Sequence, residues 1–196
     1  MADDPMDDFE TTSFTHGGKT RTVFRIGEGP AVIVMTEMPG ISPKVADFAR
    51  RVAAIGCTAG VPHLFGTPGK DGAPDGKASA AGLGYMLSSM VPACVSREFT
   101  VFATGRSSPV ITWLRALAAH EHERCGGPGV GAVGMCFTGG FALAMAADER
   151  ILAPVLSPPS MPIALTSKQK CSIAISRDGL DVVKRRCADE GLEVIG

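Results

Sequence analysis

The sequence predicts an α/β fold in which a mostly parallel sheet is flanked by helices. Two apolar runs, residues 31–35 and residues 130–135, have the composition of strands buried on both faces of a parallel sheet. Segments with apolar residues at helical spacing separate such runs, and a strand, helix, strand order implies right-handed crossovers within one sheet. The chain has 196 residues, of which 45% are hydrophobic. This length suits one sizeable domain and is too short for two complete ones.

An acidic tail is expected in front of the first element. Residues 1–18 are polar, acidic and aperiodic, which predicts a flexible tail before a domain that spans residues 19–196. Residues 20–26 alternate in polarity and predict an edge strand. The buried strand 31–35 follows.

The first crossover helix has clear start and stop signals. Ser42 is placed as the N-cap and Pro43 as the first helical residue, and apolar residues repeat at helical spacing until Gly56 ends the run. A strand is expected at residues 57–61. Residues 62–84 are then rich in glycine and proline, and residues 66–76 among them predict a long surface loop.

A second crossover helix is expected to open at Pro109. Ile111 and Leu114 would face the core, whereas Arg115 and His122 would face solvent. A glycine-rich segment ends this helix. The remaining elements are a strand from residue 130, a turn at Cys136, a helix to about residue 147, a strand at 151–156, a basic helix at 180–187, and the beginning of one more strand at 192–195.

Composition excludes several classes of partner. The chain carries 19 basic and 20 acidic residues, and this balance predicts no nucleic-acid partner and no binding to anionic membranes. Six cysteines without a C-x-x-C pair, and an acidic N-terminus where a signal peptide would be basic and then apolar, predict a reduced, cytoplasmic protein. The uncharged stretch 125–147 is long enough to cross a bilayer, but its seven glycines and Pro128 favour a buried strand, turn and helix.

Residues 129–134 match the dinucleotide-binding pattern G-x-G-x-x-G. That pattern normally follows a strand and opens a helix, whereas here it forms the strand itself. We therefore expect no dinucleotide at this position.

Cys136 is the strongest candidate for a catalytic residue. An apolar strand leads into its turn, small residues flank it, and a helix leaves it. This arrangement is typical of a nucleophile, because a helix N-terminus stabilises a thiolate and the backbone N–H of Phe137 would point at the oxygen of an attacked carbonyl. The usual elbow pattern has glycine two residues after the nucleophile, whereas this chain has Thr138. The alternative is an inert buried cysteine at a tight turn.

Two further side chains are expected at the same edge of the sheet. Glu37 comes directly after a buried strand, at the carboxyl edge where α/β folds bind their ligands. His63 follows the next strand and is a candidate base, although its surroundings are those of a loop. Without a partner at this edge, Glu37 would be an ordinary solvated carboxylate.

Three segments resemble the dienelactone hydrolase (carboxymethylenebutenolidase) family of α/β-hydrolases: residues 37–40, residues 62–66 and, above all, residues 134–146. The resemblance covers nearly the whole chain from about residue 20. It implies hydrolysis of a lactone or another carboxylic ester by a Cys, His, Asp triad. The implied partner is a small ester or lactone substrate, and no cofactor or metal ion is needed.

Four positions of this chain match the family's site. Cys136 would be the nucleophile, and Glu37 would accept the thiol proton as substrate binds. The backbone N–H groups of Met38 and Phe137 would form the oxyanion hole, one donor following the nucleophile and the other coming from an early loop.

The departure from the family concerns the acid and the base. In these folds both follow the nucleophile in the chain, yet all four histidines precede Cys136 and no aspartate after it follows a strand. We therefore expect an incomplete α/β-hydrolase domain that lacks its C-terminal strands and helices, with little or no turnover of its own. An open sheet edge would then favour self-association.

Two other functions are compatible with these residues. A glutamine-amidotransferase-like enzyme also combines a glutamate with an elbow cysteine. A degenerate, non-catalytic hydrolase module would use Cys136 only for packing.

Overall fold

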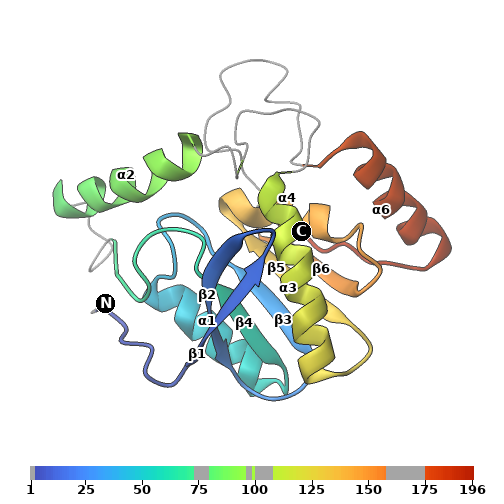
Figure 1. The fold of residues 1–196 in the computed structure, drawn as a ribbon, viewed down its shortest axis with the longest axis horizontal. Coiled ribbons are helices and arrows are strands. Elements are labelled where there is room, and N and C mark those ends of the chain that lie inside the picture. The colour runs from blue at the N-terminus through green and yellow to red at the C-terminus, as the bar shows by residue number, and fades with distance from the viewer. Residues whose placement is uncertain (1–2, 73–79, 96–98, 100–107, 158–174) are drawn as a thin grey trace.

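The computed structural model describes residues 3–72, 80–95, 99, 108–157 and 175–196. In this part of the chain six strands form one sheet in the order β1-β2-β4-β3-β5-β6 (Figure 1). The pairs β1 with β2 and β2 with β4 are antiparallel, and the other three pairs are parallel, which confirms the predicted α/β class. The strands are β1 Glu10–His16, β2 Lys19–Ile26, β3 Ala31–Met35, β4 Thr58–Pro62, β5 Val130–Met135 and β6 Ile151–Ser157.

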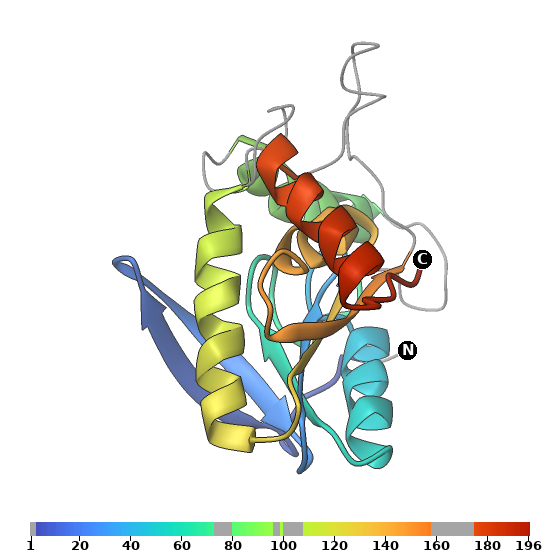
Figure 2. The ribbon, with the colours of Figure 1, turned by 90° about the vertical axis from the view of Figure 1, so that its right-hand side faces the viewer.

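Helices cover both faces of this sheet, as the two perpendicular views show (Figures 1 and 2). On one face α1 packs through Val45 into a cluster that includes Val34, and on the other face Leu114 and Phe141 join Ile33. Neighbouring residues of β3 thus point into opposite clusters, as predicted for a strand buried on both faces. The helices are α1 Pro43–Ala54, α2 Ala80–Val95, α3 Pro109–Cys125, α4 Gly139–Met145 and α6 Arg177–Asp189.

The N-terminal segment differs from the prediction. Residues Glu10–His16 form β1, the outer strand of the sheet, and β2 is therefore not the edge strand. Met6 and Phe9 are buried against α1 and the sheet. The prediction of a flexible tail over residues 1–18 is thus wrong from these residues onward. Gly17 and Gly18, both with positive φ, make the two-residue turn of a hairpin whose outer strand is too polar to show an apolar period.

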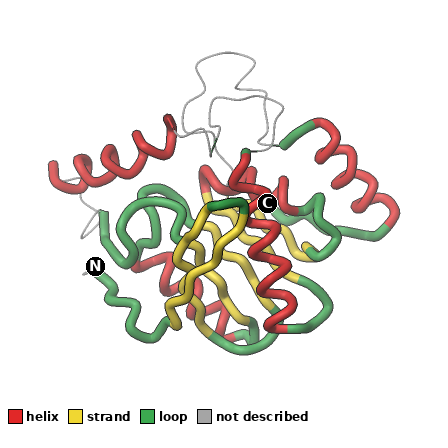
Figure 3. Tube along the Cα trace, viewed as in Figure 1, coloured by secondary structure: helices red, strands yellow, loops and turns green. Residues whose placement is uncertain are grey.

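The first crossover helix follows its sequence signals. Ser42 is the N-cap, its Oγ accepts a hydrogen bond from Val45 N at 3.4 Å, and Pro43 occupies the first turn. The helix ends before Gly56, whose φ is +84°. Helix α2 begins at Ala80, after the predicted loop 66–76, and residues 73–76 of that loop lie outside the described residues. In Figure 3 it lies to one side of the sheet, and it contacts the domain through the Tyr85 hydroxyl, which accepts a hydrogen bond from Thr67 N at 2.9 Å, and through Met90, which packs against the core.

Helix α3 confirms the predicted core residues and corrects two solvent-facing ones. Ile111 and Leu114 are buried, whereas Arg115 and His122 are half-buried rather than solvated. The Arg115 guanidinium donates a hydrogen bond to the carbonyl oxygen of Ala144. The physical reason is that α4 and β1 pack along the flanks of α3, and a helical pattern alone does not reveal such neighbours.

The predicted last strand is present as a single bridge. Ile195 pairs in parallel with Val155 of β6, with Leu156 N donating to Ile195 O at 2.7 Å and Ile195 N donating to Pro154 O at 3.1 Å. The predicted basic helix is α6, which extends three residues earlier and two residues later than expected. Within the described residues, no helix combines the length and the apolar character that crossing a bilayer requires.

Candidate active site

Cys136 lies where β5 ends and a short 3-10 helix, η2 (Cys136–Thr138), leads into α4. Its φ is +52°, in the left-handed region that residues other than glycine rarely adopt. Strained strand-to-helix turns of this kind present the nucleophile of α/β-hydrolases above the end of the sheet. The thiol is half-buried and belongs to no disulfide.

Gly134 makes this sharp turn possible. A Cβ atom placed on it would lie 2.2 Å from the carbonyl oxygen of Thr138 and 2.9 Å from the Cα of Gly139. The backbone that leaves the turn therefore passes directly over the strand that enters it. A glycine two residues before the cysteine is the sequence signal for this close approach.

Thr138, which the sequence presents as a departure from the elbow pattern, is the anchor of the turn. Its fully buried Oγ1 accepts a hydrogen bond from Met135 N at 2.8 Å. The same hydroxyl lies 3.0 Å from Met35 O and 3.2 Å from Thr36 O, so it can donate to the end of β3. Sequence reasoning missed this role, because nothing in the pattern shows which strand lies beside the turn.

Glu37 and Cys136 stand at neighbouring places on the carboxyl edge of the sheet. Met35 of β3 pairs with Gly134 of β5. Glu37 lies two residues after Met35, and Cys136 lies two residues after Gly134. Adjacent strands are about 4.8 Å apart, and this spacing sets the scale of the distance between the backbones of Glu37 and Cys136. The Glu37 side chain is exposed, and its carbonyl oxygen accepts a hydrogen bond from Gly40 N at 2.9 Å. The backbone thus forms a tight turn just beyond the end of β3, with Glu37 as its first residue.

The two residues expected to supply oxyanion-hole N–H groups directly follow Glu37 and Cys136 at this edge. Phe137 is buried in a cluster with three other phenylalanine rings, and its centroid lies 5.0 Å from that of Phe141. This packing fixes the backbone that follows Cys136. Met38 follows Glu37 in the turn and is half-buried against the same apolar cluster. The other rings of the cluster are Phe65 and Phe99.

His63 is engaged within its own loop. It follows β4, and β3 lies between β4 and β5, so two strand spacings, about 10 Å, separate the two strands. Its Nε2 lies 2.9 Å from Gly66 O, and its backbone N–H donates to Thr22 O at 2.9 Å. The imidazole is held within its own loop.

The other histidines lie away from this edge. His16 ends β1 and is exposed, and His120 stacks on Phe14 with ring centroids 5.1 Å apart. His122 lies near the end of α3, and its Nδ1 is buried.

The aspartates after Cys136 also occupy other places. Ile151 N donates to Asp148 O at 3.0 Å, so Asp148 stands at the start of β6, at the opposite edge of the sheet from Cys136. Its carboxylate pairs with Arg150 at 3.0 Å. Asp178 and Asp181 lie in the first half of α6, and Asp189 is its last residue.

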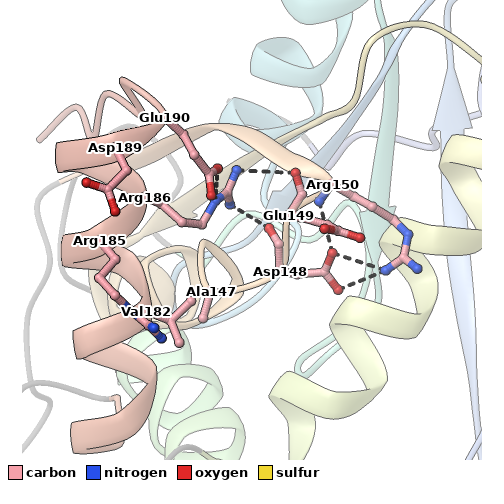
Figure 4. Close-up of a pocket in the computed structure, with 9 residues that line it drawn as sticks. All are labelled: Ala147, Asp148, Glu149, Arg150, Val182, Arg185, Arg186, Asp189 and Glu190. Carbon is pink, nitrogen blue, oxygen red and sulfur yellow. Dashed lines mark hydrogen bonds and ion pairs between the residues drawn. The ribbon is translucent and has the colours of Figure 1, made fainter.

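The hollow between the end of α4 and α6 is structural (Figure 4). The buried Arg186 donates through Nη1 to Ala146 O, Asp148 O and Ile151 O at 2.8, 2.7 and 3.0 Å. Arg186 thus supplies a hydrogen-bond donor to carbonyl oxygens at the end of α4 and along the connection to β6. Over the described ranges, no cluster of three or more His, Cys, Asp or Glu side chains could hold a metal ion.

Residues 20–191 match the family model "Dienelactone hydrolase family". The chain belongs to the dienelactone hydrolase family. The resemblance that the sequence predicted is thus confirmed, and the match includes Glu37 as well as the Cys136 turn. No relative was found among the curated proteins.

Solved structures share the fold at low sequence identity. A protein named as a dienelactone hydrolase from Klebsiella pneumoniae subsp. pneumoniae MGH 78578 is 16% identical, with a TM-score of 0.54 over 96% of this chain and 85% of that one. DcsB in complex with its substrate analogue is 15% identical, with a TM-score of 0.52 over 77% of this chain and 45% of that one. Est1E from Butyrivibrio proteoclasticus is 11% identical, with a TM-score of 0.50 over 76% and 50% of the two chains. These likenesses confirm the α/β-hydrolase architecture.

Proposed function

We propose that this member of the dienelactone hydrolase family hydrolyses a lactone or another small carboxylic ester, with Cys136 as the nucleophile. The observation that carries the proposal is the φ of +52° at Cys136, between a buried parallel strand and a helix. A residue other than glycine is held in this region only when the surrounding structure demands it, and such strain concentrates at functional sites. The close passage of the chain over Gly134 and the hydrogen bonds of Thr138 hold Cys136 in this conformation.

The chemistry assigns one role to each residue of the edge. The Glu37 carboxylate accepts the thiol proton, and the Cys136 sulfur attacks the ester carbonyl carbon to form a C–S bond. The backbone N–H groups of Met38 and Phe137 stabilise the negative oxygen of the tetrahedral intermediate. The C–O bond then breaks, the departing oxygen takes a proton, and water hydrolyses the thioester to release the acid and restore the thiol.

Turnover by residues 1–196 is proposed to be slow at the second half of this cycle. All four histidines precede Cys136 in the sequence, and His63, which follows a strand at the same sheet edge, has its Nε2 2.9 Å from Gly66 O, so we expect no efficient protonation of the departing oxygen or activation of the water. An acylated enzyme should therefore form faster than it is hydrolysed. Imidazole added to the buffer should accelerate turnover, because a soluble base can do both tasks.

The test is hydrolysis of p-nitrophenyl acetate, followed by absorbance and by intact-protein mass spectrometry. We expect a burst of one equivalent of nitrophenol, a mass increase of one acetyl group on Cys136, and the loss of both in Cys136→Ala. The control is Cys57→Ala, which removes another half-buried thiol just before β4 and should leave the burst unchanged. Glu37→Gln should lower the acylation rate about 10²-fold, since it removes the proton acceptor. A burst that survives in Cys136→Ala would disprove the assignment, and an unacylated Cys136 would favour the non-catalytic alternative.

A further inference from the structure

We infer that Arg50 is a positioning residue for the site, because it fastens an N-terminal strap, residues 3–9, over the loop that supports the Glu37 turn. This inference rests on the proposed function and deepens it. Arg50 lies on α1 and does not belong to the site itself. Three sets of contacts connect Arg50 to the site. They join Arg50 to the strap, the strap to the loop after β4, and that loop to the turn that carries Glu37.

The first set fastens the strap to α1. Arg50 binds Asp4 with both terminal nitrogens, at 2.7 and 3.0 Å, and binds Asp8 through Nε and Nη2, both at 2.7 Å. Its guanidinium also lies 5.2 Å from the ring centroid of Phe9. One planar side chain therefore grips two carboxylates in fork geometry, which fixes direction as well as distance.

The second set joins the strap to the loop that follows β4. Asp4 N donates to Gly69 O at 2.8 Å, and Asp71 N donates to the carboxylate of Asp3 at 2.9 Å. The approach is close, because a Cβ atom on Gly69 would lie 1.9 Å from Asp4 O. Met6, a residue of the strap, is buried in the cluster formed by α1 and the sheet and so holds the strap against the domain.

The third set joins this loop to the turn that carries Glu37. Gly69 N donates to Ile41 O at 2.7 Å. A Cβ atom on Gly66 would lie 1.9 Å from Pro39 O, and one on Gly40 would lie 2.5 Å from Phe65 O. Backbone thus rests directly on backbone, with no flexible side chain between them to absorb a displacement. Release of the strap should therefore loosen the turn, and with it Glu37 and the N–H of Met38.

The neighbouring Arg51 provides a matched comparison. It forms an i,i+4 pair with Asp47 on the outer surface of the same helix, at 2.8 Å, and both side chains are more than half exposed. Such exposed pairs contribute little to folding. Arg50 is only 32% exposed and connects segments more than forty residues apart in the sequence. Loss of Arg50 should therefore act on the loops, whereas loss of Arg51 should not.

The experiment compares Arg50→Met with Arg51→Met in the full chain. Hydrogen–deuterium exchange of residues 66–72 should become about tenfold faster in Arg50→Met and stay unchanged in Arg51→Met. The rate of Cys136 alkylation by iodoacetamide, read by peptide mass, should also change in Arg50→Met alone. With p-nitrophenyl acetate, the rate of the burst that reports acylation should fall about tenfold while its amplitude stays at one equivalent, because Glu37 and the N–H of Met38 act in that step.

Different results separate the inference from the proposed function. If exchange of residues 66–72 stays at the wild-type rate in Arg50→Met, the strap is disproved. Faster exchange with unaltered Cys136 alkylation would disprove the positioning role. A wild-type chain without any acylation would instead contradict the proposed function, while exchange and alkylation would still decide the inference. Asp4→Asn, which keeps an acceptor for Met6 N, replaces Arg50→Met if that variant does not fold.

Discussion

The hydroxyl of Thr138 lies 3.0 Å from the carbonyl oxygen of Met35, which bonds the turn carrying Cys136 to the end of the strand that delivers Glu37. The two halves of the candidate site come from segments about one hundred residues apart in the sequence. One buried side chain therefore fixes their relative position.

Thr138→Val tests this bond without changing the shape of the residue. The backbone groups of Met35, Thr36 and Met135 would lose a buried partner, and unfolding free energy should fall by about 1–3 kcal/mol. Urea denaturation followed by circular dichroism measures the loss. Thr112→Val, at an exposed site on α3, should be nearly neutral. Equal stability of the two variants would contradict the anchor.

Gly134→Ala tests the close passage of the turn over β5. The added methyl group would lie 2.2 Å from Thr138 O, so the strand or the turn must move, at a cost of about 1–3 kcal/mol. The acylation rate of Cys136 should fall as well, because the strained φ of the nucleophile depends on this path. The control is Gly60→Ala in β4, where the nearest atom would be 3.6 Å away. A fully active, stable Gly134→Ala would show that the turn has room for the added methyl group.

Arg186→Met removes the side chain that satisfies the carbonyl oxygens after α4. Because Arg186 is buried and donates to the carbonyl oxygens of Ala146, Asp148 and Ile151, its loss should lower unfolding free energy by about 3 kcal/mol. Thermal unfolding should show the effect, whereas the exposed Arg185→Met should unfold like the wild type. Similar midpoints for both variants would mean that water replaces these hydrogen bonds.

The strap should respond to acid. Hydrogen bonds from the Arg50 guanidinium hold the pKa of Asp4 and that of Asp8 below their usual value near 3.8. Groups with a depressed pKa stabilise the folded state above their unfolded pKa, and this contribution disappears as pH falls through the folded pKa. The stability difference between wild type and Arg50→Met should therefore be constant above about pH 5 and shrink toward zero below about pH 4. Urea titrations at several pH values measure it, and a difference that does not depend on pH would contradict this account.

Much of the fold could be predicted because its signals are local. The N-cap Ser42 with Pro43, the apolar run 31–35 and the strand, turn and helix around Cys136 all depend on neighbours in the sequence. The outer strand β1 could not be predicted from apolar pattern, since it has no buried face of its own and is stabilised by pairing with β2. Arg115 was misplaced for a similar reason, because the contact with α4 is long-range.

The sequence by itself determined the chemistry of the candidate site: a cysteine at a glycine-flanked elbow and a glutamate at the end of a buried strand. Only the tertiary structure decided how these groups meet, because register and side-chain anchoring are set by contacts between distant segments. The pairing of Met35 with Gly134 puts Glu37 and Cys136 at neighbouring strand ends, and Thr138 holds them there. Strand order likewise decided that β4, the strand before His63, lies two places from β5.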